Sequence, residues 1–157
     1  MAKEHYYNLS IKWEGNLGEG TKNYQAYLRD HSIQIPGKAL ILASSDPAFR
    51  GDPSKHNPEE LFLASISSCH MLWYLHLCAN AGIVVQSYQD EAYGIMEESA
   101  KGSGRFTKVL LRPKIVITDD SKTQEAMGLH RTANEHCFIA NSCNFPIDHE
   151  AVVRAIE

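Results

Sequence analysis

The segment that most constrains the fold runs from Asn57 to Ala81. Asn57 is a favourable N-cap residue, Pro58 suits the first helical position, and Glu60 is placed to close a capping box. No further proline and no glycine occurs before Gly82, a residue typical of the position just after a helix. The segment therefore predicts one helix of about 25 residues, roughly 37 Å long.

Apolar side chains lie around nearly the whole circumference of this helix, which predicts burial on most sides. Serine, cysteine and histidine residues interrupt the apolar run too often for a membrane span. Because the sheet of one small chain covers such a helix poorly, we expect a second copy of the chain to cover part of it. The apolar positions are Leu61, Phe62, Leu63, Ala64, Ile66, Met71, Leu72, Trp73, Leu75 and Leu77.

The rest of the chain predicts strands and a second helix. Residues 84–98 and 105–118 are expected to pair as a hairpin, with Pro113 marking an edge or a bulge. Ser121 and Gln124 predict a capping box at the start of the second helix. The full set is a half-buried strand at 7–14, strands at 24–29, 39–44, 84–98, 105–118 and 150–156, a loop at 45–56, and a helix at 121–136 with Ala126, Leu129 and Ala133 facing inward.

This order of elements predicts an α+β fold, with an antiparallel sheet packed on a long central helix and a second helix. The 157 residues are expected to form a single domain, 1–157. The net charge of −4 provides neither the basic face that binds nucleic acid nor a basic cluster for a membrane surface. The N-terminal residues contain no apolar stretch of signal-peptide length, so we expect a cytoplasmic protein.

Two of the four cysteines stand out by position. Cys69 lies in the middle of the long helix among small residues, which leave room for a ligand, and Cys137 ends the second helix. In the cytoplasm structural disulfides are rare, and those that form tend to be catalytic or redox-sensing. Free cysteine is also among the most buried residue types, so on position alone both can be packing residues. Cys78 and Cys143 are interpreted as bystanders, with Cys143 a second candidate partner for oxidised Cys69.

The residues around Cys69 also resemble a known family. Asn57–Leu61 (Asn-Pro-Glu-Glu-Leu), followed by Ser67–His70, is similar to the signature of the OsmC/Ohr family, the osmotically induced protein C and organic hydroperoxide resistance proteins. The spacing from Glu59 to Cys69 and the position of Cys137 also match the family pattern. The resemblance covers nearly the whole chain and implies an OsmC-like fold in an intertwined homodimer.

The resemblance implies a thiol peroxidase that needs no cofactor and no metal. Cys69 is then the peroxidatic thiolate, which becomes a sulfenic acid, and Cys137 resolves it to a Cys69–Cys137 disulfide. Glu59 holds an arginine in place, and Arg50 is that arginine. The substrates implied are organic hydroperoxides and, less well, hydrogen peroxide, with a lipoyl-type or other dithiol as reductant. The chain departs from familiar members at Arg50, one residue closer to the motif, and at Phe138, where many members have proline.

The chemistry explains why these residue types are needed. The thiolate is the nucleophile, and a free thiol with a pKa of about 8.5 is mostly protonated at neutral pH. Cys69 gains little from the helix dipole because it lies in mid-helix, so a cation such as Arg50 has to reach it. Glu59 lies ten residues before Cys69, about 15 Å along the helix axis. Either Arg50 bridges that gap, or Arg50 and Glu59 serve Cys69 of a second chain in a homodimer.

Two other classes of function stay open. Cys69-His70 and His136-Cys137 together offer two sulfurs and two nitrogens for zinc, although adjacent helical residues point about 100° apart and rarely share one ion. A pocket beside Cys69 also suits a non-catalytic ligand-binding module. In a peroxidase, an apolar pocket with walls from Phe62, Trp73 or Phe138 would favour organic hydroperoxides over hydrogen peroxide. His70 either tunes Cys69 or is hydrogen-bonded within the core. His76 and His130 are interpreted as structural.

Overall fold

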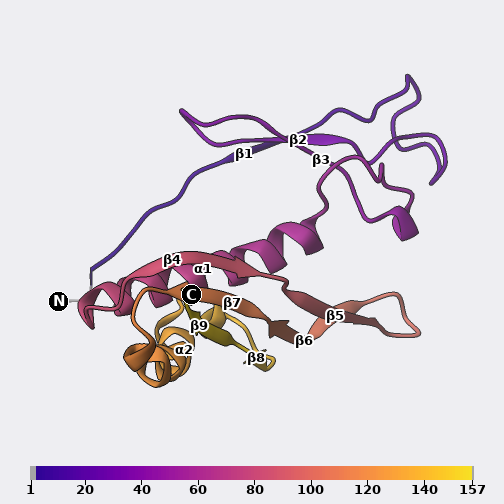
Figure 1. The fold of residues 1–157 in the computed structure, drawn as a ribbon. Coiled ribbons are helices and arrows are strands. Elements are labelled where there is room, and N and C mark those ends of the chain that lie inside the picture. Colours follow the sequence, from indigo (N-terminus) through magenta and orange to yellow (C-terminus); the bar gives the residue numbers. More distant parts are fainter. Residues whose placement is uncertain (1–2, 157) are drawn as a thin grey trace. The chain divides into compact units, whose positions relative to one another are not determined.

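The computed structural model describes residues 3–156 and divides the chain into two compact units, one up to Leu61 and one from Phe62 onward. Helix α1 (Pro58–Asn80) begins in the first unit and continues through the second (Figure 1).

The first unit contains a three-stranded antiparallel sheet in the order β1-β2-β3 (Figure 1). The strands are β1 (Ser10–Trp13), β2 (His31–Gln34) and β3 (Ile41–Ala43). The predicted strand at 24–29 is wrong, because this region forms turns, and β2 was not predicted. The Arg29 guanidinium donates to the carbonyl oxygens of Tyr24 and Tyr27, so these groups are engaged locally.

Strand β1 shows the predicted alternation of residue types but not the predicted half-burial. All four of its residues are exposed, including Ile11 at 64% and Trp13 at 42%. The prediction of a half-buried strand is therefore wrong for a single chain. The apolar face of β1 has no cover from the described residues, although alternation of this kind is typical of a strand with one covered face.

Helix α1 begins as the sequence predicts. The Asn57 side chain accepts from the Glu60 amide at 2.8 Å, and the Glu60 carboxylate accepts from the Asn57 amide at 3.3 Å, so the capping box is complete. Gly82 ends the helix region with a φ of 66°, which glycine adopts without steric cost. By length and composition alone α1 could cross a membrane, a property it shares with core helices of globular domains.

Burial along α1 is narrower than predicted. One stripe is fully buried, made of Ile66, His70, Tyr74 and Cys78, which follow one another at intervals of four. Leu72 is 62% exposed, so the expectation of burial on most sides is wrong for the single chain. The stripe packs within the second unit and fixes which side of the helix faces solvent.

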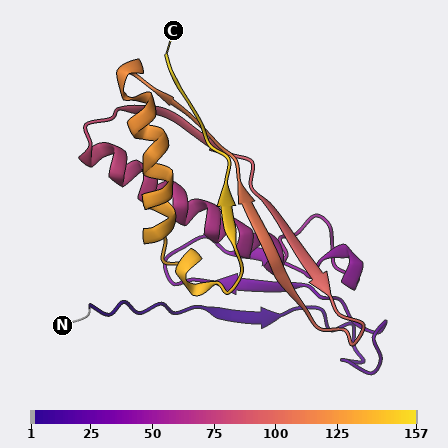
Figure 2. The same cartoon turned by 90° about the horizontal axis from the view of Figure 1, so that it is seen from below.

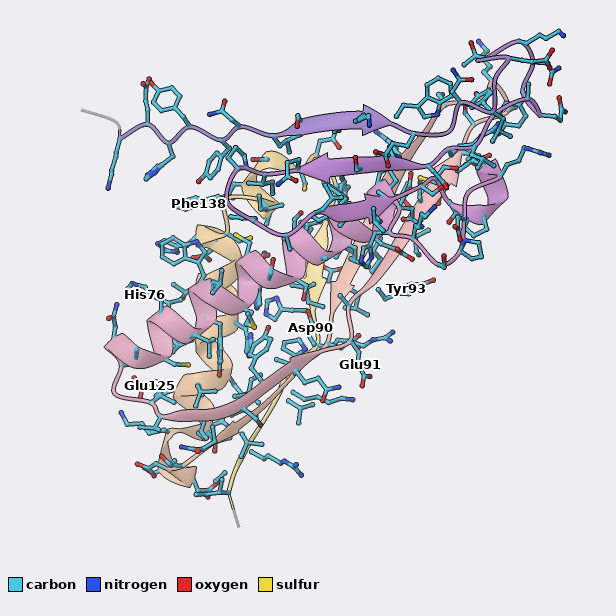
Figure 3. All side chains as sticks on the ribbon, turned by 90° about the horizontal axis from the view of Figure 1, so that it is seen from above. His76, Asp90, Glu91, Tyr93, Glu125 and Phe138 are labelled. Carbon is cyan, nitrogen blue, oxygen red and sulfur yellow. The ribbon has the colours of Figure 1, made fainter. Side chains whose placement is uncertain are left out.

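The second unit contains two three-stranded sheets in place of one long hairpin. The predicted strand 84–98 is divided into β4 (Val85–Asp90) and β5 (Tyr93–Glu98), and 105–118 into β6 (Gly104–Leu111) and β7 (Pro113–Ile117). The Arg112 amide donates to the Asp90 carboxylate at 2.7 Å where both strands break, and Pro113 begins the new strand. Asp90 lies at the bend between β4 and β5 (Figure 3).

The C-terminal strands complete these sheets. Strand β8 (Ile147–His149) pairs in parallel with β6, and β9 (Val152–Ala155) pairs in parallel with β7. The predicted strand at 150–156 is confirmed as β9, whereas β8 was not predicted. The α+β class is confirmed, but two of the six strand pairings are parallel, so the sheet is not purely antiparallel.

Helix α2 (Thr123–His136) lies across α1 (Figure 2). Ala126 and Ala133 are fully buried and Leu129 packs on the same core, which confirms the predicted inner stripe. The predicted Ser121 capping box is wrong. Asp119 accepts from the Ser121 amide at 3.0 Å and caps a 3-10 turn (Asp120–Lys122) that leads into the helix. The Asp119 carboxylate thus takes the capping role that was expected of Ser121.

Candidate active site

The structure brings Cys69 and Cys137 together. Cys69 is half-buried near the middle of α1, and Cys137 is fully buried at the C-cap of α2. Both are free cysteines, and Cys69 lies close enough to raise the pKa of Cys137. Of the two, Cys69 is the more exposed to solvent.

The surroundings of Cys137 keep its thiol protonated. Burial, followed by the nearby Cys69 side chain, raises the pKa of Cys137 to about 11. The Ala140 amide donates to the Cys137 sulfur at 3.4 Å and partly opposes the rise. Because its thiol stays protonated at neutral pH, Cys137 is a poor nucleophile while Cys69 is reduced.

The loop that carries Arg50 is tightly built. Arg50 is the one residue other than glycine in 3–156 with a positive φ, 64°, at the end of the 3-10 turn η1 (Pro47–Phe49). A Cβ on Gly51 would lie 1.6 Å from the Ser45 carbonyl oxygen, so only glycine fits there. Backbone strain of this kind concentrates at functional sites. The loop holds the Arg50 side chain exposed to solvent.

Arg50 and Glu59 are not paired with each other in the described chain. No ion pair or hydrogen bond of the Arg50 side chain occurs within residues 3–156, and Glu59 Oε2 is buried without a hydrogen-bond partner there. A buried carboxylate oxygen normally has a donor, so the Glu59 position calls for a cation or N–H group. Arg29, the other candidate arginine, is occupied, because its guanidinium stacks on the rings of Tyr24 and Tyr27 at 4.1 and 4.2 Å.

An aromatic surface adjoins the two cysteines. Trp73 follows Cys69 by one helical turn, and its ring lies 5.5 Å from that of Phe138, the residue after Cys137. Phe138 lies just beyond the end of α2 and is 69% exposed (Figure 3). Trp73, Leu72 and His76 line a shallow hollow of about 280 Å³. Phe62 lies elsewhere, packed on Phe106 at 5.0 Å.

The four residues considered for zinc are not assembled as ligands. His70 Nε2 hydrogen-bonds His130 Nδ1 at 3.0 Å, and His136 Nδ1 donates to the Thr132 carbonyl oxygen at 2.9 Å. Within residues 3–156 no group of three or more histidine, cysteine, aspartate or glutamate side chains is arranged to hold a metal ion. His70 is therefore hydrogen-bonded within the protein interior, and His136 is hydrogen-bonded to the backbone of its own helix.

Sequence reasoning missed a cluster of buried histidines. His70, His130 and His149 come from three different elements, and their ring centroids lie 5.3 to 5.8 Å apart. One signal was present in the sequence, because His130 falls on the inner stripe of α2 four residues after Ala126. His149 gave no signal, because its position is set by the parallel pairing of β8 with β6.

A family comparison matches this arrangement. The sequence model of the family described as OsmC-like protein matches residues 51–151, which include Glu59, Cys69 and Cys137. The chain belongs to the OsmC-like family. The expected relationship is thereby confirmed, and with it the fold class.

Two solved structures agree in fold with nearly the whole chain, and a further protein is similar in sequence. A solved OsmC-like protein of unknown function from Vibrio cholerae is 35% identical, with a TM-score of 0.84, over 95% of this chain and 100% of that one. An organic hydroperoxide resistance protein from Elizabethkingia anophelis is 16% identical, with a TM-score of 0.69, over 99% and 100%. The uncharacterized protein YmaD of Bacillus subtilis is 26% identical over 98% of this chain and 97% of its own length.

Proposed function

We propose that this OsmC-like protein is a thiol peroxidase that reduces organic hydroperoxides, with Cys69 as the nucleophile and Cys137 as the resolving thiol. The observation that carries the proposal is that a half-buried Cys69 on α1 and a fully buried Cys137 at the C-cap of α2 are neighbours. Several proteins of the same fold are named for organic hydroperoxide resistance, which supports the choice of substrate class.

The first step oxidises Cys69. Its thiolate attacks the terminal oxygen of the hydroperoxide, a new S–O bond forms and the O–O bond breaks. The alkoxide takes up a proton and leaves as an alcohol, and Cys69 remains as a sulfenic acid. Two electrons pass from sulfur to the peroxide. Arg50 is the proposed cation at this step, because a guanidinium stabilises the thiolate and donates to the departing oxygen.

The second step forms the disulfide. The Cys137 sulfur attacks the sulfur of the Cys69 sulfenic acid, the S–O bond breaks, and the hydroxide leaves as water with the Cys137 proton. The raised pKa of Cys137 suits this order of events, since a protonated thiol places no second negative charge beside the Cys69 thiolate. A dithiol of lipoyl type then returns two electrons and two protons and restores both thiols.

A second copy of the chain completes the proposed site. Glu59 Oε2 is buried without a partner, and the Arg50 side chain is exposed. The apolar face of β1 and Leu72 on α1 are also exposed in the single chain. A homodimer would cover this apolar surface and supply the donor that Glu59 lacks. The four free thiols suit a reducing compartment such as the cytoplasm.

The test adds one equivalent of cumene hydroperoxide to the reduced protein and follows thiol loss and peroxide consumption. We expect rapid loss of two thiols and a Cys69–Cys137 link by peptide mass. Cys69→Ser should abolish both, whereas Cys143→Ser, the matched control, should leave both unchanged. Slow oxidation with no preferred link would overturn the proposal and favour a binding module. Stoichiometric zinc in the purified protein would favour a metal site.

A further inference from the structure

Three histidines meet in the interior of the second unit, one of them next to Cys69 in the sequence, and the proposed peroxidase chemistry uses none of them. His70 comes from α1, His130 from α2 and His149 from β8. Their ring centroids are separated by 5.3 Å (His70 to His130), 5.7 Å (His70 to His149) and 5.8 Å (His130 to His149). His70 and His130 are fully buried, with at most 1% of either residue exposed. Buried polar groups are normally hydrogen-bonded, so the ring nitrogens of these histidines should have partners.

One hydrogen bond joins two of these rings. His70 Nε2 and His130 Nδ1 lie 3.0 Å apart, and among the described residues this is the single hydrogen bond between α1 and α2. The second nitrogen of each ring, His70 Nδ1 and His130 Nε2, is buried without a partner. Whichever tautomer is present, one of these two atoms carries a hydrogen and the other a lone pair. The shared bond is therefore the one polar contact that each buried ring makes.

Burial and the neighbouring charged groups favour the neutral, hydrogen-bonded form of the His70–His130 pair. Burial lowers the pKa of His70 to about 4 and that of His130 to about 3, with His149 lowering both further and Asp90 opposing the change at His70. Tyr74 stacks on the His130 ring at 3.9 Å and contributes no charge, because burial raises its pKa. At neutral pH the two imidazoles are uncharged, so one can donate and the other accept.

The location of this bond links it to the cysteines. His70 directly follows Cys69 on α1, and His130 precedes Cys137 by seven residues, two helical turns, on α2. A disulfide forms only when the Cα atoms lie within about 7 Å of each other with suitable directions. Directional bonding between buried rings fixes the rotation and the axial position of two packed helices more narrowly than apolar packing does. The distance between Cys69 and Cys137 is then set by the hydrogen bond between His70 and His130.

We propose that His70 and His130 are positioning residues for the Cys69–Cys137 disulfide: their hydrogen bond holds α1 and α2 in the register at which the two sulfurs meet. The role of the disulfide in turnover rests on the proposed function above. The bond acts on the resolving step alone, because neither ring touches the peroxide.

Three substitutions at one position separate the hydrogen bond from packing. His130→Asn places an amide atom near the position of Nδ1 and can restore the bond to His70. His130→Gln places its amide near the position of Nε2 and cannot, and His130→Leu removes both polar atoms. The readout is the equilibrium between dithiol and Cys69–Cys137 disulfide in glutathione buffers, without peroxide. It reports the effective concentration of one thiol toward the other.

We expect His130→Leu and His130→Gln to lower this effective concentration about tenfold or more, as the loss of a buried hydrogen bond implies, and His130→Asn to stay within about threefold of the parent. The first-turnover rate of Cys69 with cumene hydroperoxide should be unchanged in all three. Equal equilibria in the Asn and Gln variants would overturn the proposal, and this comparison decides even if the Leu variant fails to fold. A parent that forms no such disulfide would overturn it together with the resolving role, whereas a normal disulfide without peroxide reduction would overturn the proposed function alone.

Discussion

Cys69 on α1 is the neighbour that, together with burial, raises the pKa of Cys137 at the end of α2 to about 11. The two cysteines thus lie close together before any oxidation, with the more exposed one on α1 and the buried one at the end of α2. In the proposed reaction this order matters, because the accessible thiol meets the peroxide while the protected one keeps its proton until a sulfenic acid is present.

Removing the resolving thiol should separate the two steps. In Cys137→Ser we expect the first-turnover oxidation of Cys69 to stay within about threefold of the parent, because the resolving thiol takes no part in the attack of Cys69 on the peroxide. Steady turnover with a dithiol should fall by about 100-fold, because the sulfenic acid no longer condenses within the protein. Stopped-flow peroxide consumption and dimedone trapping measure both effects. Undiminished turnover would show that another thiol, such as Cys143, resolves the sulfenic acid.

The backbone at Arg50 allows its chemical role to be separated from its structural one. With a φ of 64°, Arg50→Gly relieves a conformation that costs roughly 1–2 kcal/mol in an L-residue and removes the guanidinium. Thermal stability should be equal or higher, while the rate constant for cumene hydroperoxide should fall about 100-fold or more. Arg29→Gln is the control, expected to lower stability through the lost tyrosine stacking. Full activity in Arg50→Gly would assign the activating cation to another residue.

The buried histidines should make the protein sensitive to acid. The pKa of His70 is lowered to about 4 in the folded state, against about 6.5 when unfolded, so the unfolded chain binds more protons between these values. Stability is full above pH 6.5 and falls as the pH drops through 6.5 toward 4, on the order of 1–2 kcal/mol per histidine at pH 5. Urea unfolding at pH 7.5 and pH 5 measures this difference. His130→Asn should reduce it, and the exposed His76, changed to Asn, should not.

Self-association should hide the exposed apolar face of β1. We expect light scattering at micromolar concentration to give twice the chain mass of 17.6 kDa. Ile11→Asp places a charge on the exposed apolar face and should produce monomers with lower activity. Ser10→Asp, one residue earlier and on the opposite face of the strand, is the matched control and should remain dimeric. A parent that is monomeric with full activity would contradict the proposed completion of the site by a second copy.

Local signals predicted the parts of the fold that depend on neighbouring residues. The capping box of α1 was readable because Asn57 and Glu60 are three residues apart, and the helix end at Gly82 because glycine tolerates positive φ. Pro113 begins β7, which is the central strand of its sheet, and the bulge in that sheet lies at Val85–Ser87, so the edge or bulge expected at Pro113 is wrong. The strand at 24–29 failed because Arg29 binds the carbonyl oxygens of Tyr24 and Tyr27, a local contact that strand patterns do not register.

The elements missed were those that depend on distant partners. Strand β8 forms because residues 147–149 meet β6, nearly 40 positions earlier in the chain. The division of the hairpin into two sheets depends on the Asp90 carboxylate, which reaches Arg112 from 22 positions away in the sequence. A sequence pattern contains the residue types and their spacing. It does not show which distant residue will pair with a given strand or side chain.

The sequence by itself determined the two cysteines, the capped helix that carries Cys69, and the family motif from Asn57 to His70, because these are properties of residue type and local spacing. Only the tertiary structure decided that Cys69 meets Cys137, that Glu59 Oε2 is left without a partner in one chain, and that His70 is bonded to His130. The physical reason is the same in each case: packing of α1 against α2 and the strands sets distances between residues tens of positions apart, and a one-dimensional pattern contains no such distances.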